Sequence, residues 1–356
     1  MLIGPDKLHK IVRQIIEAGG SAPEEADIVT SHLVRANLTG HDSHGVGMVP
    51  AYIFILQMGL LKPNTPVRLV DDHGSILRFE GDRGYGQRVA REAMAQGIER
   101  AKQNGLALVS LANAHHIGRV GTYGEQALAE GLISLHFVNV VDHSPLVAPF
   151  RGADARFGTN PVCIAVPGGD TAEPVLLDMA TSKIALGKVR VMMNKGEDVP
   201  DDTLLDKHGE PTNDPKVMFD EPRGALLAIG EHKGYGLAFM CELLAGVMTG
   251  GGTIQPGNER HNSIINHMMA VIVDPAKLVD QTWMRKEIDA VVDYFLASPA
   301  QNQDEPVLKP GDPERLLEAE RRAGGIPIDD TTWGEIVQAG EAVGFGKDKI
   351  EAVVNG

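Results

Sequence analysis

Two short segments of the sequence place histidines between glycines, where their side chains could exchange protons with a ligand. The first, residues 40–47, is Gly-His-Asp-Ser-His-Gly-Val-Gly, and the second, residues 114–119, is Ala-His-His-Ile-Gly-Arg. Histidine suits general acid–base chemistry because its unperturbed pKa lies near neutrality, and the glycines allow the chain to turn sharply. We therefore hypothesise that folding brings the two segments together into one active site.

Other interpretations fit the same residues. A turn stabilised by the side chains of Asp42 and Ser43 accounts for the first segment equally well, and one buried and one exposed histidine at a strand end account for the second. His41, Asp42, His44 and His116 are also of the types that bind zinc, which would make the protein a metal-dependent hydrolase. No cysteine or histidine pair nearby in the sequence completes such a set, so we expect no bound metal.

The composition is that of a globular intracellular protein. A chain of 356 residues with 43% hydrophobic and 23% charged residues is long enough for two domains. The net charge of −15 argues against nucleic acid or an anionic membrane as partner. The sequence shows no signal peptide and no apolar run long enough to span a membrane, and Cys163 and Cys241 lie in apolar runs typical of buried thiols. We expect a cytoplasmic protein.

Apolar periodicity predicts a helical beginning (1–65), an α/β middle (66–275) and a helical end (276–356) that packs with the beginning. The first helices are expected over 6–18, 21–38 and 46–58, the second opened by a capping box of Ser21 and Glu24. The middle is expected to contain helices over 86–103, 122–130 and 237–248 and strands over 67–70, 75–79, 106–111, 133–140, 161–166, 174–177 and 268–273.

The sequence lacks the Gly-x-Gly-x-x-Gly fingerprint of an ordinary dinucleotide-binding turn, and it lacks a Walker A loop. Residues 178–182, Asp-Met-Ala-Thr-Ser, are expected to lead into a helix, where Asp178 or Thr181 could cap the first turn. A helix N-terminus also binds phosphate groups, as could Lys233, which stands beside glycines. A bound nicotinamide cofactor would therefore need an unusual site.

Taken together, these segments resemble the malate/L-lactate dehydrogenase family that is unrelated to the Rossmann-type enzymes of similar name, and within it the hydroxycarboxylate dehydrogenase branch. The resemblance covers nearly the whole chain. It rests on Asp-Ser-His-Gly at 42–45, His-His-Ile-Gly at 115–118, Ala-Pro-Phe at 148–150, Gly-Thr-Asn-Pro at 158–161, Asp-Met-Ala-Thr-Ser at 178–182, Lys-Gly-Tyr-Gly-Leu at 233–237 and Lys-Pro-Gly-Asp at 309–312.

The resemblance implies a three-layer α/β domain around a mixed, largely antiparallel sheet, joined to a helical domain built from both chain ends. It also implies a homodimer that reduces 2-oxo acids to 2-hydroxy acids by hydride transfer from NAD or NADP. A non-catalytic protein that only binds ligands on the same fold is the remaining alternative. The substrate class, small 2-oxo and 2-hydroxy acids, follows from the resemblance and not from the residue pattern.

Carried over residue by residue, the family's proton donor falls on His116, and Ser43 and His44 fall on positions that line the reaction centre. Cofactor contacts fall on Val120, Gly121, His143, Leu177, Asp178, Met179, Ala180, Thr181, Lys233, Gly311, Asp312 and Glu314. Many relatives have a substrate-binding arginine four residues after the histidine of Ser-His-Gly, where this chain has Met48. Arg119 could bind the substrate carboxylate instead, since bidentate arginine is the usual solution, or it could contact a cofactor phosphate.

Overall fold

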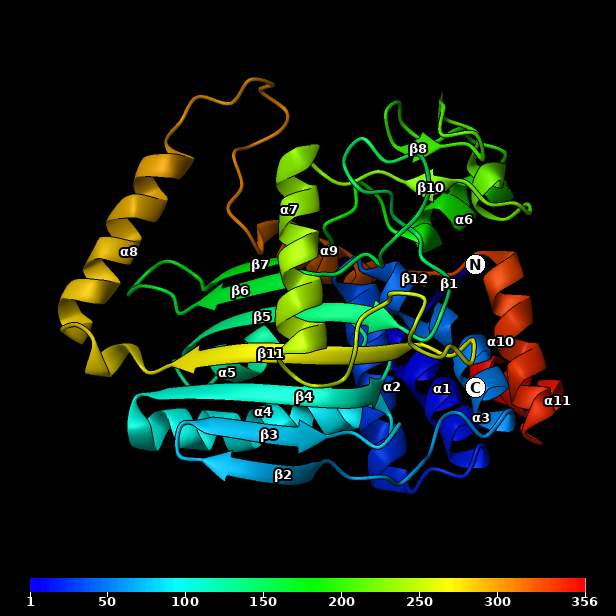
Figure 1. Ribbon diagram of the computed structural model, residues 1–356, viewed down its shortest axis with the longest axis horizontal. Helices are drawn as coiled ribbons and strands as arrows, with labels where there is room; N and C mark the ends of the chain where they lie inside the picture. The colour runs from blue at the N-terminus through cyan, green and yellow to red at the C-terminus, as the bar shows by residue number, and fades with distance from the viewer. Residues whose placement is uncertain (356) are drawn as a thin grey trace.

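The computed structural model describes residues 1–355 and places a seven-stranded sheet at their centre (Figure 1). Within this sheet β3 and β4 are parallel, and every other neighbouring pair is antiparallel. The sheet is therefore mixed and largely antiparallel, as predicted. Its strands, in spatial order, are β2 (Arg68–His73), β3 (Ile76–Glu80), β4 (Leu106–His115), β11 (Ile265–Val273), β5 (Ile133–Val141), β6 (Val162–Val166) and β7 (Val175–Met179).

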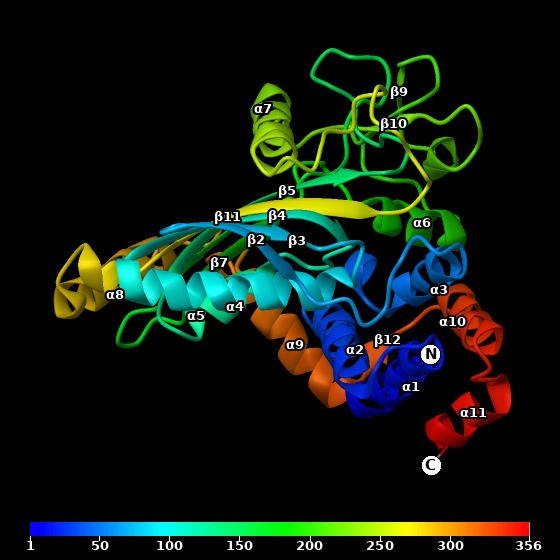
Figure 2. The ribbon, with the colours of Figure 1, turned by 60° about the horizontal axis from the view of Figure 1, so that its bottom comes forward.

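Helices cover both faces of the sheet, which gives the three layers that were predicted. Helices α4 (Gly86–Asn104) and α5 (Gly121–Leu128) lie on one face, and α7 (His232–Cys241) lies on the other (Figure 2). The α4 and α5 side holds a core of alternating strand residues, such as Val109 and Leu111, packed against helix residues such as Met94. A smaller sheet of β8 (Leu204–Leu205), β9 (Pro211–Thr212) and β10 (Ala225–Leu226) lies beyond the central sheet.

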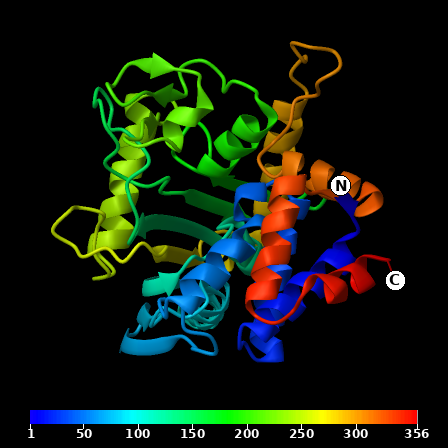
Figure 3. The same ribbon diagram turned by 90° about the vertical axis from the view of Figure 1, so that its right-hand side faces the viewer.

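The two ends of the chain pack into one helical layer (Figure 3). Leu8, Ile15 and Leu33 from the beginning share a buried core with Ile336 and Ile350 from the end. Strand β1 (Leu2–Ile3) also pairs with β12 (Ile326–Pro327). The helices of this layer are α1 (Pro5–Ala18), α2 (Pro23–Leu38), α3 (Val49–Gln57), α9 (Asp312–Gly324), α10 (Asp330–Ala342) and α11 (Lys347–Asn355). The three-part division of the chain at 65 and 275 remains a prediction.

Helix α8 (Gln281–Leu296) lies apart from this layer, at the far end of the sheet (Figure 1). Its Asp289 accepts backbone hydrogen bonds from Asp170, Thr171 and Ala172, in the loop between β6 and β7. No helix among the described residues has the length and apolar character needed to cross a membrane. Cys163 and Cys241 are both buried free thiols, as predicted.

Several element ends differ from the sequence-based predictions for local reasons. The N-cap of α2 is Ala22, because the Ser21 hydroxyl donates to Glu25 instead of capping the helix. The hairpin turn is tighter than expected, since β2 continues to His73 and pairs with Ile76 across two residues. The helix expected to begin at 237 begins at His232 and passes into a π-helical turn, η4 (Glu242–Val247).

The segment after Asp178 does not begin a helix. Asp178 lies in β7, and the next helix, α6 (Leu186–Lys195), starts seven residues after Met179 with Ala185 as its N-cap. Asp178 instead accepts the backbone N–H of Gly121, the first residue of α5, at 2.8 Å. The prediction that Asp178 or Thr181 caps the following helix is therefore wrong, and Asp178 contacts the start of a helix from a distant part of the sequence instead.

Candidate active site

The two histidine segments meet, as hypothesised. Nδ1 of His44 lies 3.1 Å from Nε2 of His116, and the two rings stack with their centroids 5.2 Å apart. His44 belongs to a single 3-10 turn, η1 (Asp42–His44), whereas His116 follows the last residue of β4. Two imidazoles in direct contact form a centre where a proton can be held or moved.

The backbone around His116 is fixed from two sides. Asn266 of β11 accepts the N–H of Ile117 at 2.9 Å and donates to the carbonyl of Asn139 at 2.9 Å, which ties the loop to two strands. The start of α4 packs so closely against the loop that a Cβ on Gly86 would collide with the carbonyl oxygens of His115 and His116. The position of His116 is thus set by the sheet and by α4 together.

Tyr52 is the second partner of His116, and sequence reasoning missed it. The Tyr52 hydroxyl lies 2.6 Å from Nδ1 of His116 and accepts a hydrogen bond of 2.7 Å from the amide of Gln87. All three side chains are buried. The only hint in the sequence is a tyrosine within the otherwise apolar segment that becomes α3.

Burial determines the charge state of these histidines. It lowers the pKa of His44 to about 4, with further lowering by His41 and Arg119. It also holds the pKa of His116 well below the usual value, assisted by repulsion from His44 and His115. Because burial raises the pKa of Tyr52, its hydroxyl stays protonated. The centre is therefore neutral at pH 7.

The histidine pair borders a cavity of about 530 Å³ with mostly apolar walls. Met48, Phe54 and Ile55 come from α3 and the turn before it, and Phe219 and Ile264 from the opposite side. Ser43 and His44 line this cavity together with His116 and His143. A small molecule with an apolar body would fit beside the two imidazoles.

A second, more polar groove of about 740 Å³ meets this cavity at the reaction centre. The residues that line both are Ser43, His44, Gly118, Val120, Thr159, Pro161 and Ala185. The groove continues past Arg119, Lys183, Lys188 and Glu314. Two ligands could therefore approach His44 from two sides, one in the apolar cavity and the other in the groove.

Arg119 faces the groove and not the apolar cavity. Its fully buried side chain donates to Glu125 at 2.9 Å and lies 3.5 Å from Asp178. Its Nε and Nη2 donate no hydrogen bond to any described residue. This placement does not support the expected contact between Arg119 and the substrate carboxylate, and it favours the alternative of a cofactor contact.

The expected cofactor residues gather only in part. Val120, Asp178, Met179, Ala180 and Glu314 line the groove with Arg119. Gly311 lines a smaller adjoining hollow, and His143 lines the apolar cavity. The residues found outside both spaces are Gly121, Leu177, Thr181, Lys233 and Asp312.

Two of these outlying residues have evident structural roles. The buried hydroxyl of Thr181 donates to the carbonyl of Thr159 at 2.9 Å, and Asp312 pairs with Lys309 at 2.7 Å. Lys233 lies exposed in the first turn of α7.

The four side chains of the metal hypothesis do not converge. Asp42 accepts hydrogen bonds from Arg321 at 2.7 and 3.0 Å, and His41 lies 3.4 Å from Glu314. Within residues 1–355, no group of three or more histidine, cysteine or acidic side chains is arranged to hold a metal ion. His41 and Asp42 thus anchor the turn, and His44 alone of the four reaches His116.

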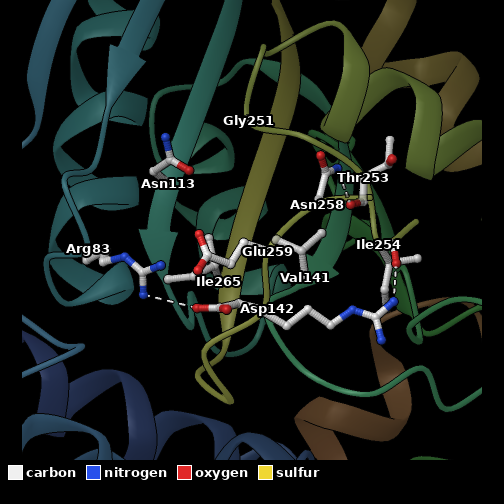
Figure 4. A pocket seen from close by; sticks show the side chains of 11 residues that line it. Arg83, Asn113, Val141, Asp142, Gly251, Thr253, Ile254, Asn258, Glu259 and Ile265 are labelled. Carbon is white, nitrogen blue, oxygen red and sulfur yellow. Dashed lines mark hydrogen bonds and ion pairs between the residues drawn. The ribbon is translucent and has the colours of Figure 1, made fainter. Parts of the chain in front are cut away.

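A buried ion pair supports the wall behind His143. Arg83 donates to Asp142 at 3.0 Å beside a hollow of about 100 Å³ (Figure 4), and Asp142 also lies 3.2 Å from Nδ1 of His261. The Asp142 side chain is only 4% exposed, and these two partners satisfy its oxygen atoms. The pair fixes the end of β5 next to the apolar cavity.

Comparisons with known proteins agree with this architecture. A family model described as malate/L-lactate dehydrogenase matches residues 3–337. Hydroxycarboxylate dehydrogenase B of Escherichia coli K12 is 43% identical over 347 residues, which cover 97% of this chain and 95% of that protein. L-lactate dehydrogenase of Cupriavidus necator is 38% identical, over 96% of this chain and 98% of its own.

Solved structures show the same fold. A candidate malate/lactate dehydrogenase from E. coli superimposes with a TM-score of 0.95 at 42% identity, covering 100% of this chain and 99% of its own. Sulfolactate dehydrogenase from Methanocaldococcus jannaschii gives a TM-score of 0.84 at 29% identity, covering 99% of both chains.

Proposed function

We propose that this chain, which belongs to the malate/L-lactate dehydrogenase family of 2-hydroxy acid oxidoreductases, reduces 2-oxo acids to 2-hydroxy acids with NAD or NADP as cofactor. The observation that carries the proposal is the position of the His44–His116 pair, where an apolar cavity and a polar groove meet. A reductase of this kind needs one space for the substrate and one for the cofactor, which must meet so that the hydride can reach the keto carbon, with the proton donor beside the substrate.

The groove has the donors and acceptors that a nicotinamide cofactor requires. Nε and Nη2 of Arg119 are buried without hydrogen-bond partners among the described residues, and they would donate to a phosphate. Lys183 and Lys188 add positive charge along the groove. Oε2 of Glu314 is buried without a partner and would accept from a ribose hydroxyl. When bound, the reduced cofactor supplies the hydride that reaches the keto carbon.

His116 would exchange the proton through Nε2, which faces His44 and the cavity. The Tyr52 oxygen accepts a hydrogen bond from Gln87 and can accept a second from Nδ1–H of His116, which is present both in the imidazolium and in the neutral ring that has given up its Nε2 proton. It therefore holds His116 in place in both charge states. In the reduction, the His116 imidazolium gives its Nε2 proton to the developing alkoxide and becomes neutral.

The lowered pKa of His116 keeps the ring neutral at pH 7, ready to act as a base when a 2-hydroxy acid is oxidised. Reduction uses the protonated ring, which is a stronger acid but less populated, so the rate of reduction should rise as the pH falls below 7. Ser43 and His44, which line the same cavity, would orient the carbonyl group and stabilise the charge that develops on its oxygen.

The proposal also includes a homodimer in the cytoplasm. Exposed apolar side chains on α7 and η4 support the dimer, among them Phe239 at 52% and Met248 at 61% exposure, as do Trp283, Tyr294 and Phe295 on α8. Exposed apolar surface of this extent is typical of protein contacts. Two free cysteines suit a reducing compartment.

The test is to follow NADH and NADPH absorbance with purified protein and phenylpyruvate, hydroxyphenylpyruvate, 2-oxoglutarate, oxaloacetate or pyruvate. We expect oxidation of one cofactor with at least one of these acids, unaffected by chelators. His116→Ala should lower the rate on the order of 10²- to 10⁴-fold, whereas His208→Ala, an exposed histidine outside both spaces, should not. Loss of activity with chelator would favour the hydrolase, and a His116→Ala variant with normal turnover would contradict the assigned proton donor.

A further inference from the structure

The apolar cavity contains one cation without an acidic partner, Arg190 of α6. It lines the cavity together with Ser43, His44 and His116 and is half-buried, yet it forms no hydrogen bond or ion pair with any described residue. The other arginine on this wall, Arg223, is exposed and pairs with Glu221 at 2.9 Å. A guanidinium that is half-buried in an apolar cavity has lost part of its hydration, which is unfavourable, so an anionic ligand would stabilise it.

Arg190 is held close to the reaction centre by the packing of α6. A Cβ on Gly187 would lie 2.8 Å from that of Ser43, so the first turn of α6 rests directly on the turn that carries His44. One helical turn further, Nη2 of Arg190 lies 3.9 Å from where a Cβ on Gly47 would stand. The guanidinium therefore sits beside the turn at 46–48, whose Met48 lines the same cavity.

The nearest acidic competitor is already engaged. Arg190 contributes to lowering the pKa of Asp329, after larger effects that include hydrogen bonds from Thr332, but no ion pair joins the two side chains. Asp329 is the N-cap of α10 and accepts from the N–H of Thr332 at 2.9 Å and from its hydroxyl at 2.7 Å. Arg190 thus keeps its donors free for a ligand.

We propose that Arg190 binds the C1 carboxylate of the 2-oxo acid in the apolar cavity. The inference rests on the proposed function. Its geometry places the carboxylate toward α6, the keto oxygen toward His116 and Ser43, and the remainder of the substrate against Phe54, Ile55 and the other apolar walls. A planar guanidinium can bind a carboxylate through two parallel hydrogen bonds, which would fix the orientation of the keto group.

The test compares Arg190→Met and Arg190→Lys with wild type on phenylpyruvate, pyruvate and 2-oxoglutarate. We expect Arg190→Met to lower kcat/KM on the order of 10²-fold for all three acids, as for one partner of a desolvated charge pair. Lysine should restore part of the loss, and added guanidinium should partly rescue the methionine variant. The affinity for NADH alone should not change. The matched control, Lys195→Met, removes an exposed charge from the same helix outside the cavity and should change kcat/KM less than threefold.

Three results would overturn the inference. An unchanged kcat/KM in Arg190→Met would show that Arg190 does not bind substrate. A loss confined to 2-oxoglutarate would show that it binds a second carboxylate. A lower melting temperature with normal kcat/KM would make Arg190 a distant structural partner of Asp329. Calorimetry should also compare the binding of phenylpyruvate to cofactor-loaded wild type and cofactor-loaded Arg190→Met. This comparison tests the role of Arg190 even if wild type turns over none of the acids, because the absence of turnover would refute only the proposed function.

Discussion

Removing the Tyr52 hydroxyl tests whether His116 depends on a buried partner. Tyr52→Phe keeps the ring, which lies 5.8 Å from that of His116, and deletes only the oxygen that joins Nδ1 of His116 to Gln87. Nδ1 of His116 and the amide nitrogen of Gln87 would then be without a hydrogen bond, and both side chains are buried. The substitution changes no charge and creates a cavity of one oxygen atom.

The magnitude follows from the two lost hydrogen bonds. A buried group left without its partner costs about 1–3 kcal/mol, so the two groups together should lower the free energy of unfolding by roughly 2–6 kcal/mol. If the same interaction holds His116 in its reactive orientation, the loss appears in the transition state too, and kcat should fall roughly 5- to 150-fold. KM for the 2-oxo acid should change little, because Tyr52 does not line the cavity.

The assay combines steady-state kinetics with ¹⁵N chemical shifts of the histidine rings, which report the protonation of Nδ1 and Nε2. The control is Tyr85→Phe, since the Tyr85 ring lies 6.0 Å from that of Tyr52 but its hydroxyl bonds neither histidine of the centre. We expect the shifts of one histidine to move in Tyr52→Phe only. Wild-type kcat in Tyr52→Phe, or an equal loss in Tyr85→Phe, would refute the positioning role.

Two further predictions concern the whole molecule. Burial lowers the pKa of seven histidines. The values fall to about 3 for His32, His115 and His136 and to about 4 for His44 and His267, and the pKa values of His116 and His143 are lowered too. An unfolded histidine has a pKa near 6.5, so the unfolded state binds more protons as the pH falls from 6.5 toward 4, and each of the five histidines with a value of 3 or 4 should lower the free energy of unfolding by roughly 1.4 kcal/mol per pH unit. A urea midpoint that is the same at pH 5 and pH 7 would contradict this. If the protein is a homodimer, light scattering should give twice the chain mass of 38.1 kDa. Phe239→Glu should lower this mass if the exposed face of α7 forms the contact. A single-chain mass for wild type at micromolar concentration would exclude the homodimer.

Much of the fold could be predicted because local patterns are strong where one face of an element is buried. Helix α1 matches its prediction closely because Leu8, Ile11 and Ile15 repeat at helical spacing and Gly19 and Gly20 follow. The sequence could not predict that Asp178 caps α5, because that contact joins residues 57 positions apart. The sequence also could not predict that α7 passes into the π-helical turn η4, because no distinct residue pattern marks such a turn.

The sequence predicted the part of the candidate site that two recognisable motifs form. It did not predict the single residues that come from segments without a motif. The meeting of His44 and His116 followed from two glycine-flanked segments. Tyr52 and Arg190, in contrast, stand in helices with no motif around them, and only the packing of those helices brings them to the centre. Arg119 shows the opposite case, since its place beside a catalytic loop suggested a substrate contact, while Glu125 and Asp178 bind it on the groove side.

The turn that carries Ser43 and His44 reconciles the two interpretations of its sequence. Asp42 is structural, because Arg321 of α9 binds both its carboxylate oxygens and Asn37 donates to it at 2.6 Å. Asn37 also accepts the N–H of Val46 at 2.8 Å, so the turn is tied down at both ends. This anchoring leaves His44 directed at His116 without a hydrogen bond of its own to the surrounding turn. The end of the chain, through α9, therefore takes part in placing the reaction centre, although it approaches that centre only at the groove, through Glu314.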